Sequence, residues 1–154
     1  MLSSDRNPAG RALVFRAAGH TCALNLAHVV EIMRPLPVEP VAGAPDMVRG
    51  LSAIRGVPVP VVALGALFHA GSAASGRFVV VRTGSRQIAL AVDAVLGICE
   101  LAPSVQQAMP PLVRDAAMGA VDAIAALDSE LYFVLNAARI VPDERWQPLA
   151  IQEP

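Results

Sequence analysis

Arg11-Ala-Leu-Val-Phe-Arg16 returns as Arg77-Phe-Val-Val-Val-Arg82, and this repeat decides the fold. The same offset of 66 residues aligns Ala23–Ile32 with Ala89–Ile98. The register holds without a gap for about 35 positions, which is long enough to indicate a duplicated structural unit. The sequence therefore predicts two similar halves. Positions where the halves agree report on the fold, and positions where they differ are candidates for function.

Each repeat begins with a pattern that is typical of a β-hairpin. Two short apolar runs, Arg11–Ala17 and His20–Leu26, are separated by Ala-Gly. Phe78–Arg82 and Gln87–Val92 form the equivalent pair in the second half. Because side chains alternate along a strand, we expect one face to carry Ile88, Leu90 and Val92 and the other Gln87, Ala89 and Ala91.

The rest of each repeat is shorter and richer in proline. Ala27–Met33 has apolar residues at helical spacing and predicts one or two helical turns. Four prolines in Arg34–Pro45 favour an extended connection at a sheet edge. Ser104–Met118 is expected to be irregular or partly helical. Strands are expected on both sides of the turns Arg55-Gly56 and Asp128–Glu130: Leu51–Ile54, Val57–Ala63, Ala120–Leu127 and Leu131–Asn136.

Many short strands with Pro and Gly turns predict an all-β fold, mainly β with short helices. Two closed or nearly closed barrels would hide most sheet edges. Since each half alone is too small for a sizeable core, we expect the halves to share an interface. The expected organisation is a flexible tail over 1–10, one domain over 11–141 and a tail over 142–154. Within the domain, the first barrel is expected at about 11–70 and the second at about 76–141.

Composition excludes several classes of protein. The net charge is −1, which gives no basic field for nucleic acid. The stretch from Gly56 to Gly76 carries no charge, but Pro58, Pro60 and Gly65 interrupt it, so we expect no direct membrane insertion. The first residues show no signal peptide, and two cysteines 77 positions apart are no disulfide framework. A cytoplasmic protein is expected.

No group of residues forms a recognisable catalytic motif. His20 and Cys22 lie two apart on a predicted strand and could supply two metal ligands, but no second pair follows at ligand spacing. Ser52 lacks the flanking glycine of a nucleophile elbow. We therefore expect no enzyme, no metal and no cofactor. A small metal-dependent enzyme using His20 and Cys22 is kept as an alternative.

The halves differ most in their charged residues. Glu31 aligns with Gly97, and Arg34 aligns with Glu100. If the 66-residue offset continues, Arg55 falls opposite Val121. An arginine between Ile54 and Gly56 is costly to bury unpaired. It could be a surface turn residue, it could pair with a carboxylate such as Glu31, or it could contact a partner.

The order of motifs resembles a CheW-like domain, the coupling module of bacterial chemosensory arrays. The first half carries Val29-Val-Glu31-Ile32, then a proline-rich stretch, Gly50, Ile54-Arg55-Gly56 and Val59-Pro60-Val61. Ile88–Val95 and Ala125–Asn136 in the second half fit the same family, so the resemblance covers Arg11–Val141. Two positions depart from the family pattern, since Ala53 replaces an Asn and Ala63 replaces an Asp.

The resemblance implies two SH3-like five-stranded β-barrels packed together, without catalysis. It implies an adaptor that couples the signalling tip of a methyl-accepting chemoreceptor to the regulatory domain of a CheA-type histidine kinase. Such a protein would be cytoplasmic and recruited to membrane-associated receptor arrays. The kinase contact is assigned to no residue, and a stand-alone SH3-like module with another partner, or with itself, is the alternative. The implied receptor-binding groove consists of Val29, Glu31, Ile32, Gly50, Arg55 and Gly56.

Overall fold

The computed structural model describes residues 10–68, 76–111 and 119–141, and this part of the chain is built almost entirely of short strands. Its helical segments are short 3-10 turns, so the all-β prediction is confirmed. The strands are β1 (Arg11–Ala17), β2 (His20–Asn25), β3 (Val29–Met33), β4 (Val48–Ile54), β5 (Val57–Ala63), β6 (Arg77–Thr83), β7 (Arg86–Val92), β8 (Ala94–Glu100), β9 (Gln106–Gln107), β10 (Val121–Leu127) and β11 (Glu130–Leu135). The 3-10 turns are η1 (Leu26–His28), η2 (Leu64–Phe68), η3 (Pro103–Val105) and η6 (Ala137–Arg139).

The helical turns expected at Ala27–Met33 are confirmed only at the start of that segment. Only η1 is helical there, and β3 begins directly after it at Val29. Two valines and an isoleucine are β-branched and suit an extended backbone, and β6 offers them an antiparallel partner. Pairing with β6 therefore overrides the helical spacing of the apolar residues.

The strands form two sheets with the same internal order. Sheet A runs β8-β1-β2-β11-β10-β9, and sheet B runs β3-β6-β7-β5-β4. Each strand of sheet B has a counterpart at the same place in sheet A, and β9 is the additional strand. In both sheets, one pair of neighbours is parallel (β2 with β11 and β5 with β7). The duplication that the sequence indicates is therefore present in the strand order.

The offset between the halves changes along the chain. It is 66 residues for the hairpins, where Ala17 pairs with His20 as Thr83 pairs with Arg86. It becomes 73 later, because Val48 corresponds to Val121 and Val57 to Glu130. The connection from β8 to β10 is longer than that from β3 to β4. Arg55 therefore corresponds to Asp128, and the expected match to Val121 is wrong.

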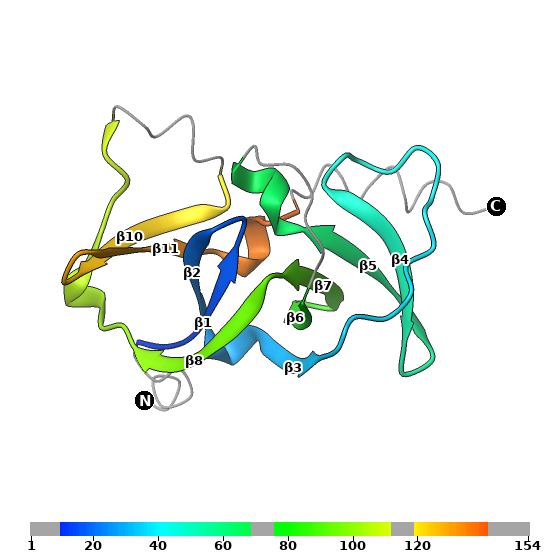
Figure 1. Ribbon diagram of the computed structural model, residues 1–154, viewed down its shortest axis with the longest axis horizontal. Helices are drawn as coiled ribbons and strands as arrows, with labels where there is room; N and C mark the ends of the chain where they lie inside the picture. Colours follow the sequence, from blue (N-terminus) through cyan, green and yellow to red (C-terminus); the bar gives the residue numbers. More distant parts are fainter. Residues whose placement is uncertain (1–9, 69–75, 112–118, 142–154) are drawn as a thin grey trace.

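The two halves exchange their hairpins. The β1–β2 hairpin pairs with β8 and β11 in sheet A, whereas the β6–β7 hairpin lies between β3 and β5 in sheet B. Figure 1 shows β10 and β11 at one end of the molecule, β4 and β5 at the other, and both hairpins between them. The expected split into barrels at 11–70 and 76–141 is therefore corrected, since each sheet takes strands from both sides of residue 70. The two hairpins have similar apolar patterns, so the pattern alone does not say which sheet each one joins.

Three apolar clusters hold the sheets together. A shared core between the sheets contains Phe15 and Leu24 of one hairpin and Val79 and Leu90 of the other. This confirms the expected interface between the halves. Strand β7 is buried on both faces: Ile88, Leu90 and Val92 join the shared core, whereas Ala89 and Ala91 face the interior of sheet B. Sheet B encloses larger side chains such as Phe78 and Ile54, and sheet A encloses mostly alanines.

Some expectations concern residues that the structure does not describe. The tails, apart from Gly10, and the linker His69–Gly76, apart from Gly76, lie outside the described residues, as does 112–118 of the segment expected to be irregular. Among the residues that are described, no helix is long and apolar enough to cross a membrane.

Candidate protein-interaction site

A two-residue turn, Arg55-Gly56, connects β4 to β5 at one end of sheet B. Ile54 and Val57 pair on either side of it. The backbone φ angles are 53° at Arg55 and 79° at Gly56. Positive φ at both central residues is typical of the hairpin turn that matches strand twist, and a residue other than glycine adopts it only at a conformational cost. The turn projects Arg55 outward, and its side chain is 78% exposed.

Arg55 makes a two-pronged ion pair with Glu31 of β3. Arg55 Nε donates to Glu31 Oε2 at 2.9 Å, and Arg55 Nη2 donates to Oε1 at 2.8 Å. Strands β3 and β4 stand at opposite ends of the sheet B order, so the pair joins the two ends of one curled sheet. In Figure 1, β3 and the β4–β5 turn lie on the same side of the molecule. Such fork-to-fork pairs fix orientation better than a single contact does.

The ion pair shifts the pKa of both residues in the direction that favours their charged forms. Hydrogen bonding from Arg55 is the largest effect and lowers the pKa of Glu31; desolvation opposes it, and the Arg55 charge makes a smaller contribution in the lowering direction. The same contact raises the pKa of Arg55. Two of the interpretations made from the sequence are therefore true together. Arg55 is a surface turn residue, and it is paired with Glu31.

Exposed apolar side chains flank both ends of this ion pair. The β3–β6 register passes from Val29 opposite Val81 to Glu31 opposite Val80, so Val30 forms a bulge. Val30 and Ile32 are 44% and 42% exposed, and Val57, beside the turn, is 52% exposed. We call Val30, Glu31, Ile32, Arg55 and Val57 the ion-pair surface. Large apolar side chains around an anchored arginine are typical of protein interaction sites.

Two of the expected groove residues have supporting positions. Gly50 is buried at φ 147°, and a Cβ atom there would collide with the carbonyl group of Glu39. This close approach allows two backbone hydrogen bonds between Glu39 and Leu51, at 2.8 and 2.9 Å. Val29 is half-buried and packs against the shared core. Gly50 and Val29 therefore hold the strands in place, whereas Glu31, Ile32, Arg55 and Gly56 reach the surface.

Val30 and Val57 were not expected at the site. Val30 is exposed because of the bulge in β3, and Val57 because β5 begins at this residue. The alternation of apolar residues along a strand does not predict a bulge. The only available signal was adjacency, since each valine is next or nearly next in sequence to a charged residue that had been singled out.

The equivalent place in sheet A keeps the two apolar residues of the bulged strand, has Glu130 in place of Val57, and lacks the ion pair. Asp128 replaces Arg55 at the turn, with φ 60°, and Gly97 replaces Glu31 at the same bulge. Leu96 and Ile98, the counterparts of Val30 and Ile32, are 53% and 54% exposed. Because glycine has no side chain, the corresponding pair cannot form. The difference in charge between the halves is thus a real difference between two otherwise similar surfaces.

His20 and Cys22 are placed poorly for metal binding. The His20 ring lies against Phe68, with 4.1 Å between centroids and a tilt of 41°, and meets Phe133 edge-on at 5.4 Å. Burial, with a smaller effect of Asp93, raises the pKa of Cys22 to about 12. A thiol binds zinc as thiolate, so this protonated thiol is a weak ligand. The described part of the chain contains no group of three or more His, Cys, Asp or Glu residues placed to hold a metal ion.

Comparison with known proteins identifies a family that spans most of the chain. The family model of the CheW-like domain matches residues 11–145. The chain belongs to the CheW-like family. The resemblance seen in the sequence is thereby confirmed, and the two-sheet fold is the one it implied.

A solved structure has the same fold as this CheW-like chain. The scaffolding protein TtCheW from Thermoanaerobacter tengcongensis superposes with a TM-score of 0.73. The two sequences are 22% identical, and the match covers 83% of this chain and 89% of the other. No curated protein sequence shows a significant match to the chain.

Proposed function

We propose that the chain is a non-enzymatic adaptor of a bacterial chemosensory array. It couples the cytoplasmic signalling tip of a methyl-accepting chemoreceptor to the regulatory domain of a CheA-type histidine kinase. Membership of the CheW-like family supports this role. The observation that carries the proposed receptor site is the Glu31–Arg55 pair, exposed at a sheet end and flanked by apolar side chains.

The proposed recognition mode is a receptor helix laid against the ion-pair surface. Val30, Ile32 and Val57 would contribute apolar contact area, and Arg55 would set the register of the helix. Glu31 already orients the guanidinium, so binding costs little side-chain ordering at this position. Val29, Gly50 and Gly56, the other members of the expected groove, would shape the backbone beneath these contacts.

An adaptor needs a second surface that remains available when the first is occupied. Sheet A offers exposed Leu96, Ile98 and Leu131, and none of them belongs to the ion-pair surface. We propose that the chain uses the two sheets for different partners. Each contact needs only modest affinity, because an array engages many copies at once. The chain would act in the cytoplasm, recruited to membrane-associated receptors.

Non-enzymatic function is supported by the chemistry of the described residues. The thiol of Cys22 is buried and protonated, and the ring of His20 packs against two phenylalanines. Neither group is positioned as an activated nucleophile or base. The alternative of a small metal-dependent enzyme has no further observation in its favour.

Charge reversal at Arg55 tests the receptor site. Arg55→Glu places two carboxylates together at the surface, so we expect an unchanged fold and receptor binding that is weaker by about tenfold or more. Binding is measured by co-sedimentation with receptor signalling fragments and a CheA-type kinase, and the fold by circular dichroism. Arg139→Glu is the matched control, because Arg139 is also exposed and paired with an acid, Asp122, at 3.7 Å.

A double reversal separates contact from scaffolding. Glu31→Arg combined with Arg55→Glu restores an ion pair of opposite direction. If Arg55 itself touches the receptor, the double variant remains weak; if only the pair is needed, binding returns. Binding by Arg55→Glu that equals wild type would exclude this site. Wild-type protein that sediments with neither partner would favour the stand-alone SH3-like module instead.

A further inference from the structure

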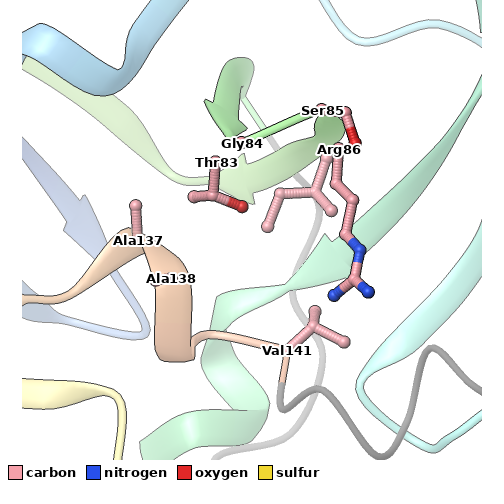
Figure 2. Close-up of a pocket in the computed structure, with 8 residues that line it drawn as sticks. Thr83, Gly84, Ser85, Arg86, Ala137, Ala138 and Val141 are labelled. Atoms are coloured by element: carbon pink, nitrogen blue, oxygen red, sulfur yellow. The ribbon is translucent and has the colours of Figure 1, made fainter.

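A pocket of about 380 Å³ opens between the β6–β7 turn and η6. Its floor is apolar, formed by the buried side chains of Ile88, Ala137 and Val141. Thr83, Ser85 and Arg86 contribute polar groups to its walls. Figure 2 shows Arg86 extending from the turn toward Val141, with Ala137 and Ala138 of η6 on the other side of the view. The pocket shares no residue with the ion-pair surface.

The duplicated fold supplies a second version of this place. The hairpin offset of 66 residues maps Arg86 onto His20, since each ends a two-residue turn and opens the second strand of its hairpin. The later offset of 73 maps Ala137 onto Leu64 and Val141 onto Phe68. Equivalent backbone hydrogen bonds, from Ala63 to Met47 and from Asn136 to Ala120, support that second offset.

In the second version, side chains of the chain itself fill the space. The rings of Phe68 and His20 pack against each other at 4.1 Å with a tilt of 41°, and Phe133 meets Phe68 edge-on at 5.5 Å. Leu64 is fully buried beneath them. At the pocket, Ala137 occupies the position of Leu64, and Val141 occupies the position of Phe68. The pocket is therefore the same site without its aromatic occupant.

We infer that this pocket receives an aromatic side chain from a partner polypeptide, with a carboxylate next to it. The ring would take the place that Phe68 takes in the other half, and the Arg86 guanidinium would replace the His20 imidazole as the group packed against it. A guanidinium on an aromatic face gains a cation–π attraction. The hydroxyls of Thr83 and Ser85 and the charge of Arg86 favour an acidic neighbour of that ring.

Size favours a side chain over a larger ligand. A volume of about 380 Å³ is at the lower end of the range for small-molecule sites, roughly 300 to 1,000 Å³. The inference concerns a surface that the proposed receptor contact does not use. It is tested with neither receptor nor kinase, so its failure and that of the proposed function are distinguishable.

The direct test titrates the full chain, isotopically labelled, with acetyl-Phe-Asp-amide and follows amide chemical shifts. We expect shifts centred on Ser85, Arg86 and Ala138, with a dissociation constant on the order of 1 mM for so small a ligand. Acetyl-Leu-Asp-amide should bind about fivefold more weakly or worse, because it cannot stack. Absence of localised shifts would overturn the inference. So would phenylacetate that binds as tightly as the dipeptide, since the pocket would then be a site for free aromatic acids.

Two variants test the mechanism from opposite sides. Val141→Phe recreates the intramolecular plug, so we expect a higher melting temperature and dipeptide binding reduced by about tenfold or more. Unchanged binding by a folded Val141→Phe protein would contradict the inference. Arg86 is exposed, so the Arg86→Met variant keeps the pocket open while removing the charge. This variant should bind acetyl-Phe-Asp-amide and acetyl-Phe-Asn-amide equally well. A persisting preference for the acidic peptide would exclude the role of Arg86.

Two further variants supply the control and the competing occupant. Phe68→Val removes the plug of the first half and should create a second binding site around His20. If no second site appears, the two places are not equivalent and the inference fails. Trp146, five positions beyond Val141, is the only tryptophan of the chain. Tighter dipeptide binding by Trp146→Ala would assign the pocket to the chain's own tail and overturn the assignment to a partner.

Discussion

Substitution of Gly50 by alanine tests how the backbone beneath the ion-pair surface is supported. Gly50 lies at φ 147°, a conformation that residues with a side chain rarely adopt. Its added methyl group would meet the carbonyl group of Glu39, which is part of the backbone and cannot rotate away as a flexible side chain could. The segment around Glu39 must therefore move away from β4.

The expected cost has two parts. Backbone strain at this φ costs about 1 to 3 kcal/mol. Displacement of the segment breaks the two hydrogen bonds between Glu39 and Leu51, each worth about 1 kcal/mol net. The bond that Ser52 Oγ donates to the Pro37 carbonyl, at 2.7 Å, would weaken as well. We expect Gly50→Ala to lower the free energy of unfolding by about 3 to 5 kcal/mol.

The assay is urea denaturation followed by circular dichroism, and the chain offers a closely matched control. Gly97 has φ 144°, but nothing lies within 4 Å of a Cβ atom placed there. Gly97→Ala therefore carries the strain without the collision, and we expect it to cost about 2 kcal/mol less than Gly50→Ala. If the two variants are equally stable, the close approach of Glu39 to Gly50 has no energetic importance, which would contradict the predicted collision.

Two further predictions concern the buried residues. Phe78→Ala removes the largest side chain inside sheet B, 1% exposed, and should cost about 3 to 5 kcal/mol in urea denaturation; a loss below about 1 kcal/mol would mean that this core is not closely packed. The pKa of Cys22 is raised from 9.0 to about 12, so above pH 9 the unfolded thiol loses its proton while the folded one keeps it. Stability should therefore fall by about 1 kcal/mol between pH 9 and pH 10 from this group alone. Unfolding measured at pH 9 and pH 10 should show a shallower decline for Cys22→Ala, and an equal decline would contradict the burial of the thiol.

The candidate site was predicted in part from the sequence. Glu31 and Arg55 stood out because their counterparts in the other repeat differ in charge, and the structure brings these two residues together. The match of Arg55 to Val121 was wrong, because a longer connection between β8 and β10 changes the offset. Gly50 was grouped with the contact residues, but the structure needs a glycine there because the backbone of Glu39 packs closely against it. A glycine needed for space inside the protein and one needed at a surface look the same in a sequence.

The short strands, their hairpin turns and the presence of two similar halves follow from the amino-acid sequence alone. These features depend on the alternation of apolar and polar residues, on glycine and proline at turns, and on the sequence repeat. All of these patterns can be found by comparing residues along the chain. The folded molecule was needed to show that the hairpins exchange sheets, that Glu31 and Arg55 close the ends of sheet B, and that one of two equivalent sites is open. Each of these depends on contacts between segments far apart in the chain. Such contacts are selected by the fit of whole strands and side-chain volumes, which no local pattern records.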